Sequence, residues 1–414
     1  MWKHPWGYLE GLTICAGLIV TGGLLQSIAG EFDSSALSYP VNVIALAAIV
    51  LLPAALHVLS RKHAALRWFS SYRASITALA AFLFLMLVAG LVPQTTGRDN
   101  AETSSGFDRV VSSWPFALTF VYLLAVLGAV VLRRLQNFDL KKDTGFVLNH
   151  VGLFVALVCA ALGAGDLQRL RMTVALNTPE WRAANEKNEI EELAMALELN
   201  SFVIDEYPPR LMMLDNTTGE VLPKGRPEDI RVETCPLAAS LRGWEIEVVK
   251  FLPSAASMTT KDTVFFTEFH SEGATSALYV RARNPQTGVS REGWVSCGNY
   301  MFPYHSLRLS ADESLIMPRR EPRRFASAVT AYSKDEAAKN ATIEVNKPMR
   351  YGGWKIYQSG YDEERGKWSR TSMFELVRDP WLPAVYAGIW MMIGGAVCLF
   401  VSAPKKNTIT RDKQ

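Results

Sequence analysis

One histidine, His150, lies inside a long apolar stretch, and its side chain has the clearest potential for chemistry. The stretch runs from Gly145 to Asp166 (GFVLNHVGLFVALVCAALGAGD) and is long enough to cross a bilayer, which takes about 20 residues. An ionisable side chain at that depth is costly unless it faces the protein and has a partner, so His150 is a candidate functional residue.

The other residues of this stretch divide into two faces if it forms a helix. His150 then shares its face with large apolar side chains, which are Phe146, Val147, Leu153, Phe154 and Leu157. A second stripe is small and lets a neighbouring helix approach closely; it contains Asn149, Gly152, Ala156, Ala160 and Gly163. An imidazole beside large apolar side chains suits a flat apolar ring with a metal at its centre, with Phe154 and Leu157 against the ring. An interhelical hydrogen bond explains the same histidine, and this stretch alone does not decide between the two.

A second histidine, His57, ends another apolar run four residues before Arg61, at a depth similar to that of His150. Two imidazoles at one depth can hold an iron from opposite faces, so His57 is a candidate second ligand. A histidine at such a place more often extends to the membrane interface. The chain contains no nucleotide-binding loop, Ser-His-Asp arrangement or zinc-ligand spacing, and we predict no catalytic residue and no nucleic acid partner.

The composition indicates a membrane part and a soluble part. The 414 residues are 49% hydrophobic with a net charge of +3, and the mean hydropathy of +0.09 is high for a soluble protein and low for a pure membrane bundle. None of the five cysteines forms a CxxC or CxxCH motif. This argues against covalently attached haem and against a dithiol redox centre of the usual spacing.

Six apolar runs near the spanning length predict a polytopic α-helical membrane protein: Tyr8–Ala29, Val41–Leu59, Ser75–Val92, Trp114–Leu132, Gly145–Gly165 and Leu382–Val401. Lysine and arginine collect in alternate connections, which are residues 1–5, 61–73, 133–142 and 405–414. Positive charge marks cytoplasmic loops, so we predict that both termini face the cytoplasm from the cell's inner membrane.

That orientation places the polar stretch 167–380 outside the cytoplasm as a domain of its own. Period-two alternation, as in Trp244–Val248, and turn signals such as Tyr351-Gly352-Gly353 predict a mostly-β domain, which we expect to be a sandwich. Thr178–Leu193 has the composition of a short helix as an alternative. Cys235 and Cys297 either form a disulfide in this compartment or remain two unpaired thiols, since sequence gives no distance.

Four motifs resemble the ResB/CcsB family between about Ser71 and Ser402. They are Ala89–Gln94 closing a span, Asn149–Leu153 around His150, Val345–Tyr351 continued through Ser359 (VNKPMRYGGWKIYQS), and Val377–Gly388 entering the last span. The third is the most specific of the four. The family's usual plan has four spans, formed here by residues 71–166 and 381–414, so residues 1–70 add two helices in front.

The resemblance implies a subunit of system II cytochrome c maturation. Such a subunit, with a CcsA-like membrane partner, takes up cytoplasmic haem b and presents it outside for attachment to CxxCH apocytochromes c. His150 matches the family's helix histidine and would be an axial ligand to haem iron; His57 matches no motif. The partner's tryptophan-rich WGxxWxWD motif is absent here, so we expect a haem-presenting subunit of a synthase complex and a separate partner.

Two other functions fit the same sequence features. One is a membrane-anchored extracytoplasmic sensor or scaffold, in which His150 is structural. The other is a transporter of a different substrate through the helical bundle.

Overall fold

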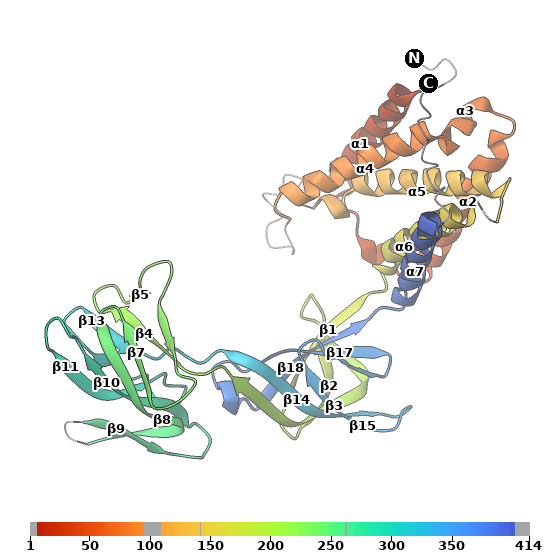
Figure 1. The fold of residues 1–414 in the computed structure, drawn as a ribbon. Coiled ribbons are helices and arrows are strands. Elements are labelled where there is room, and N and C mark those ends of the chain that lie inside the picture. Colours follow the sequence, from red (N-terminus) through yellow and green to blue (C-terminus); the bar gives the residue numbers. More distant parts are fainter. Residues whose placement is uncertain (1–5, 95–108, 141, 261–262, 402–414) are drawn as a thin grey trace, which may run out of the picture. The chain divides into compact units, whose positions relative to one another are not determined.

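The computed structural model describes residues 6–94, 109–140, 142–260 and 263–401. The chain forms two compact units, one from residues 1–167 with 379–414 and one from residues 168–378. Helices make up the first unit and strands the second (Figure 1). The predicted cytoplasmic tail, residues 405–414, lies outside the described residues.

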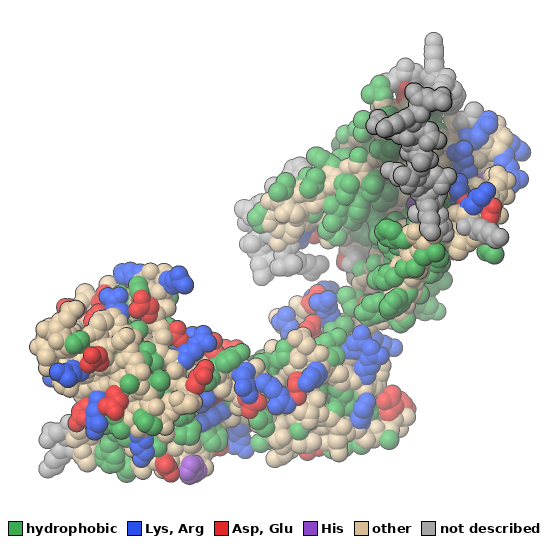
Figure 2. All heavy atoms as spheres, in the orientation of Figure 1, with side chains coloured by type: hydrophobic (Ala, Val, Ile, Leu, Met, Phe, Trp, Pro, Cys, Tyr) green, Lys and Arg blue, Asp and Glu red, His purple; other side chains and the backbone are tan. Residues whose placement is uncertain are grey.

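All six apolar runs form helices, as the sequence predicts. Their bounds are α1 (Tyr8–Ala29), α2 (Val41–Ser60), α4 (Tyr72–Leu91), α5 (Trp114–Leu135), α6 (Thr144–Gly163) and α7 (Leu382–Val401). Each of these six is long and apolar enough to cross a membrane. Serine side chains define two of the starts, because Ser71 accepts from the Ala74 amide and Ser113 from the Phe116 amide. Apolar side chains cover the outside of the helical unit, whereas charged ones spread over the β unit (Figure 2).

The two N-terminal helices belong to this bundle. Helix α1 packs on α4 and α5, and α2 packs on α5 and α6. Buried Cys15 of α1 lies in a core with Ala78 of α4 and Tyr122 of α5. The helices that precede the family's usual four therefore contribute directly to the core around α5.

Helices α6 and α7 pack most intimately, through the predicted small stripe. A Cβ added at Gly152 would lie 2.6 Å from the Gly388 carbonyl oxygen, and one added at Gly395 would lie 2.5 Å from the Asn149 amide nitrogen. The Asn149 side chain donates to the Met392 carbonyl at 3.2 Å. The stripe is thus the α7 contact, which leaves the opposite face of α6, with His150, for other neighbours.

The helix ends group as the predicted topology requires. At one end, Arg73 donates to the Trp6 carbonyl at 3.2 Å and Arg133 to the Ser70 carbonyl at 3.1 Å. At the other end, the Phe32 amide donates to the Ser112 carbonyl at 2.9 Å. The predicted cytoplasmic segments are therefore joined to each other, and so are the predicted outer connections.

Asp166, just after α6, joins three helices at the predicted outer end. Its carboxylate accepts from the Tyr39 amide at 2.8 Å, from Asn42 Nδ2 at 2.6 Å and from Trp381 Nε1 at 2.7 Å. Burial would raise the pKa of Asp166, but these three hydrogen bonds outweigh it and lower the pKa. The ionised carboxylate therefore holds the start of α2 and the approach to α7 against the end of α6.

The β unit begins and ends in one eight-stranded antiparallel sheet of order β15-β14-β3-β2-β1-β18-β17-β16. Its strands are β1 (Gln168–Ala175), β2 (Pro179–Ala184), β3 (Ile190–Glu206), β14 (Pro322–Ser333), β15 (Lys339–Glu344), β16 (Met349–Tyr351), β17 (Trp354–Tyr361) and β18 (Thr371–Arg378). The sheet curls until the Lys339 ammonium of β15 donates to the Arg350 carbonyl of β16 at 3.1 Å. A buried core that includes Leu197, Ile356 and Phe374 fills the concave side.

The middle of the unit forms two five-stranded sheets that share a core, which agrees with the predicted sandwich. One contains β7 (Leu237–Leu241), β8 (Trp244–Thr259), β9 (Val264–Glu268), β10 (Thr275–Arg283) and β11 (Ser290–Ser296). The other contains β4 (Arg210–Asp215), β5 (Val221–Leu222), β6 (Asp229–Arg231), β12 (Leu307–Arg308) and β13 (Glu313–Ile316). Met213 and Leu315 of the second sheet pack with Ile246 and Leu278 of the first.

The helix alternative for Thr178–Leu193 is wrong, because this segment is the β2–β3 hairpin. The Asn185 side chain accepts from the amides of Lys187 and Glu189, and Asn188 adopts a φ of 60°. Asparagine tolerates this left-handed conformation, and the resulting turn overrides the helix propensity of the neighbouring Glu, Lys and Ala residues.

Cys235 and Cys297 are separate free thiols. The Cys235 sulfur lies 3.7 Å from the Val248 carbonyl, and the Cys297 sulfur lies 3.6 Å from the Thr275 hydroxyl. Of the two states left open by the sequence, the structure contains the unpaired one.

Candidate functional site

His150 lies half-buried on α6, and one of its two ring nitrogens is in a hydrogen bond. Nδ1 lies 2.8 Å from the Phe146 carbonyl oxygen, one helical turn earlier. A carbonyl can only accept, so Nδ1 carries the proton. In the neutral imidazole the lone pair is then on Nε2, for which the described residues contain no hydrogen-bond partner. This is the tautomer that a metal-binding histidine needs.

The Phe146 ring packs against the His150 imidazole, and Arg134 packs against Phe146. The Phe146 ring stacks on the His150 ring with centroids 3.9 Å apart and planes 25° apart. The Arg134 guanidinium, from the last turn of α5, lies 5.6 Å from the Phe146 centroid. Arg134 pairs with Asp143 at 2.5 Å. A hydrogen bond from the Asp139 amide lowers the pKa of Asp143, with Arg134 adding to it, so this carboxylate stays ionised.

Phe154 and Leu157 lie on the His150 face of α6 and pack against α2 and α5. They contact a buried cluster formed by Leu124, Val158 and Leu162. Gly128 of α5 makes room there, since a Cβ at that position would lie 2.7 Å from the Pro53 ring and 3.4 Å from the Phe154 ring. The face that the sequence assigns to an apolar ligand therefore points toward α2 and α5, away from α7.

His57 lies at the corresponding end of α2, with a protein partner of its own. Its Nε2 lies 2.7 Å from the side-chain nitrogen of Gln136, which follows α5. An amide nitrogen donates, so His57 Nε2 accepts and its lone pair is engaged. The described residues show no ring contact or hydrogen bond between His57 and His150, and they contain no group of three or more His, Cys, Asp or Glu side chains placed to hold a metal ion.

The VN…YQS signature forms a tight strand–turn–strand unit at one edge of the curled sheet. Asn346 turns the chain between β15 and β16 with a φ of 64°. Gly352 and Gly353, with φ values of 57° and 79°, then reverse it so that Tyr351 pairs with Trp354. Buried Gln358 donates to the Gly360 carbonyl at 2.8 Å. The signature thus fixes the backbone geometry of this edge of the sheet.

Two features of the site were not assigned a role from the sequence. Arg134 falls in the basic segment 133–142 that marks the topology and Asp143 directly follows that segment, while Phe146 appears only as one apolar member of a face. The i to i+4 spacing of Phe146 and His150 is the available signal, because residues four apart are neighbours on a helix.

The family model described as "ResB-like family" matches residues 140–373. The match spans more than half of the chain and includes His150 and the VN…YQS segment, whereas Ala89–Gln94 and Val377–Gly388 lie outside it. No curated protein matches the sequence.

Proposed function

The chain belongs to the ResB-like family, and from that premise we propose that it is a haem-presenting subunit of a cytochrome c maturation complex. The family match points to a role in cytochrome c biogenesis. In the proposed function, the protein and a CcsA-like membrane partner take up haem from the cytoplasm. They then present it on the other side of the membrane to CxxCH apocytochromes c.

The geometry of His150 is the observation that carries the proposal. Nδ1 is held by the Phe146 carbonyl, and Nε2 has no partner among the described residues. Imidazole is a common axial ligand to haem iron, and fixing the remote nitrogen orients the ring and sets its tautomer. The surroundings of the ring are apolar, as a mostly apolar substrate requires, with Phe154 and Leu157 of the same face already packed against α2 and α5.

The residues of the helical unit act here by binding and orientation. His150 would supply one axial ligand, while Phe146 and Arg134 hold the plane of the imidazole. Since His57 Nε2 already accepts from Gln136, we assign the second axial ligand to the partner. Thioether formation would then depend mainly on positioning haem against the apocytochrome thiols.

Replacing Phe146 with Leu should weaken haem retention without unfolding α6. Leucine keeps an apolar side chain and the backbone carbonyl that accepts from His150, but it removes the ring stack and the Arg134 contact. Aromatic pairs contribute about 0.5–1.5 kcal/mol beyond their buried area, so haem should transfer to an added acceptor protein about 2- to 12-fold faster. Phe84→Leu, on the exposed side of α4, is the matched control. Equal haem transfer rates in Phe146→Leu and Phe84→Leu would show that Phe146 does not contribute to haem binding.

The proposed orientation places the β unit outside the cytoplasm, and exposed Cys235 provides a native reporter. A membrane-impermeant maleimide should label Cys235 in cells with a permeabilised outer membrane, if one is present, because the basic loops set both termini inside. In a Cys235→Ser background, Lys142→Cys should label only after lysis. Labelling of Lys142→Cys in intact cells would reverse the topology.

A sensor or scaffold remains the second candidate, and a simple spectrum separates it from the proposed function. The chain purified with its partner from haem-replete cells should show a Soret band. A colourless complex would favour the scaffold.

A further inference from the structure

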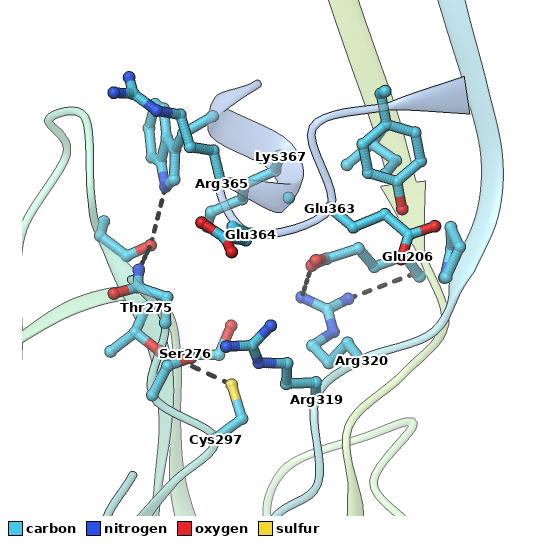
Figure 3. A pocket seen from close by; sticks show the side chains of 18 residues that line it. Glu206, Thr275, Ser276, Cys297, Arg319, Arg320, Glu363, Glu364, Arg365 and Lys367 are labelled. Atoms are coloured by element: carbon cyan, nitrogen blue, oxygen red, sulfur yellow. Dashed lines mark hydrogen bonds and ion pairs between the residues drawn. The ribbon is translucent and has the colours of Figure 1, made fainter. Parts of the chain in front are cut away.

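The β unit contains a cavity with several charged side chains in its lining, and the proposed haem-binding helix does not use it. It measures about 310 Å³ and lies between the curled sheet and the β8–β10–β11 sheet. Residues far apart in the sequence line it, among them Glu206, Cys297, Arg319, Arg320 and Lys367. Figure 3 shows Glu364 and Arg365 on the side of the short helix η5 (Gly366–Trp368), opposite Arg319 and Arg320. The volume is at the lower end of the range for small-molecule sites.

Lys367 belongs to a short segment that hydrogen bonds anchor at this cavity. The Trp368 indole next to it donates to the Ala274 carbonyl at 3.0 Å, and the Gly366 amide donates to the Asp362 carbonyl at 3.0 Å. The Lys367 ammonium lies 5.3 Å from the Trp368 centroid, and it donates to the Pro253 carbonyl at 3.5 Å. The segment is therefore already ordered before any ligand binds, which reduces the entropy lost on binding.

The charged side chains that line the cavity do not balance, since four are cationic (Arg319, Arg320, Arg365 and Lys367) and three are carboxylates (Glu206, Glu363 and Glu364). Arg320 pairs with Glu206 at 3.0 Å, and Arg365 pairs with Glu272 at 3.4 Å. Lys367 and Arg319 have no carboxylate within ion-pair distance among the described residues. The pKa of Lys367 is lowered, mainly because burial disfavours its charged form. Attraction to Glu206 raises the pKa and repulsion from Arg320 lowers it, so the nearby carboxylate does not fully compensate for the lost hydration of the ammonium. Glu363, Glu364 and Arg319 are exposed, so water screens their charges, whereas Lys367 is partly buried.

We infer that this cavity binds a carboxylate group, held by the Lys367 ammonium and the Arg319 guanidinium. An arginine fork and a lysine point charge are the usual donors to such an anion. The free-thiol side chain of Cys297 and the Thr275 hydroxyl line the same wall. The carboxylate could belong to a small organic acid or to a propionate of haem; only the second source rests on the proposed function.

Alkylation of Cys297 provides a direct probe on the full-length protein. Iodoacetamide is uncharged, and peptide mass spectrometry would follow its reaction with Cys297 while exposed Cys235, which does not line the cavity, serves as the internal control. Sodium propionate should slow alkylation of Cys297 at least threefold and leave Cys235 unchanged, compared with sodium chloride at equal ionic strength. Lys367→Met should abolish the protection, and Lys250→Met, an exposed lysine on β8, should keep it.

Arg319→Gln is a second test that avoids the packed segment. Arg319 is exposed, so its loss should not unfold the unit, yet it should reduce protection by propionate at least threefold. Absence of protection in the wild type, or full protection in both variants, would overturn the inference. Equal protection by phosphate and sulfate would also overturn it, since the site would then take any oxyanion.

A comparison of haem with its dimethyl ester separates the two sources of the carboxylate. Protection by micromolar haem but not by the ester assigns the site to a propionate, whereas protection by propionate alone assigns it to a free acid. Either result supports a carboxylate site. Loss of haem from a His150→Gly variant tests the helical site only, so the two sites can fail separately.

Discussion

Replacing His150 with Gly should remove stably bound haem from the complex while the membrane protein remains assembled. The substitution deletes the proposed iron ligand and leaves a cavity on the face of α6 that contains Phe154 and Leu157. Added imidazole should enter that cavity and restore part of the Soret band and of cytochrome c maturation. The expected effect is nearly complete, because His150 is the proposed iron ligand and its hydrogen bond to the Phe146 carbonyl places the lone pair of the neutral ring on Nε2.

A purely structural His150 predicts a different result. A side-chain hydrogen bond between helices in a membrane contributes on the order of 1 kcal/mol, so haem content would survive with a modest loss of thermal stability. His57→Gly is the matched control, since His57 lies at the corresponding end of α2 and bonds to Gln136. We expect that variant to keep its spectrum. Full haem content and full activity in His150→Gly would show that His150 is not a haem ligand and that α6 serves only in helix packing.

Replacing Gly388 with Leu should prevent α6 and α7 from packing and should abolish accumulation of the folded protein. Even a Cβ at this position would lie 2.7 Å from the Ala156 amide nitrogen and from the Gly152 carbonyl oxygen, and neither backbone atom can move without shifting a helix. Overpacking by a few methyl groups typically costs about 1–3 kcal/mol, and a clash with backbone costs more.

Gly23→Leu is the control for this substitution, because a Cβ at Gly23 of α1 meets nothing within 4 Å. The two variants should be compared by protease resistance and thermal unfolding in detergent. Normal folding of Gly388→Leu would show that α7 can separate from α6, and the close contact would then play no part in holding His150.

Much of the helical unit could be predicted because its signals are local. Length and apolarity alone define a membrane span, and the spacing of Gly152 and Asn149 identifies one tightly packed face. The sequence could not identify the neighbour of the other face. That depends on which helices meet, and at Gly128 of α5 both Pro53 of α2 and Phe154 of α6 approach the same position.

Less of the β unit could be predicted, because its sheets depend on pairing between strands that are far apart in the sequence. Alternation predicts its strands one at a time, and the Gly352-Gly353 turn is visible in the sequence, but the pairing of distant strands is not. The cavity at Lys367 combines Glu206, Cys297 and Arg319, which are far apart in the sequence and are brought together only by the pairing of distant strands. At Thr178–Leu193, local helix propensity pointed away from the turn that Asn185 and Asn188 impose.

The most direct measurement uses isotope-labelled imidazole on the His150→Gly complex. With ¹⁵N-imidazole and ferric haem, pulsed electron paramagnetic resonance should detect ¹⁵N coupled to the iron, because the added ring occupies the place of His150. The wild-type complex with the same reagent should show no such coupling. Bound haem in His150→Gly without ¹⁵N coupling would contradict the account, since the iron would then take both of its axial ligands from elsewhere.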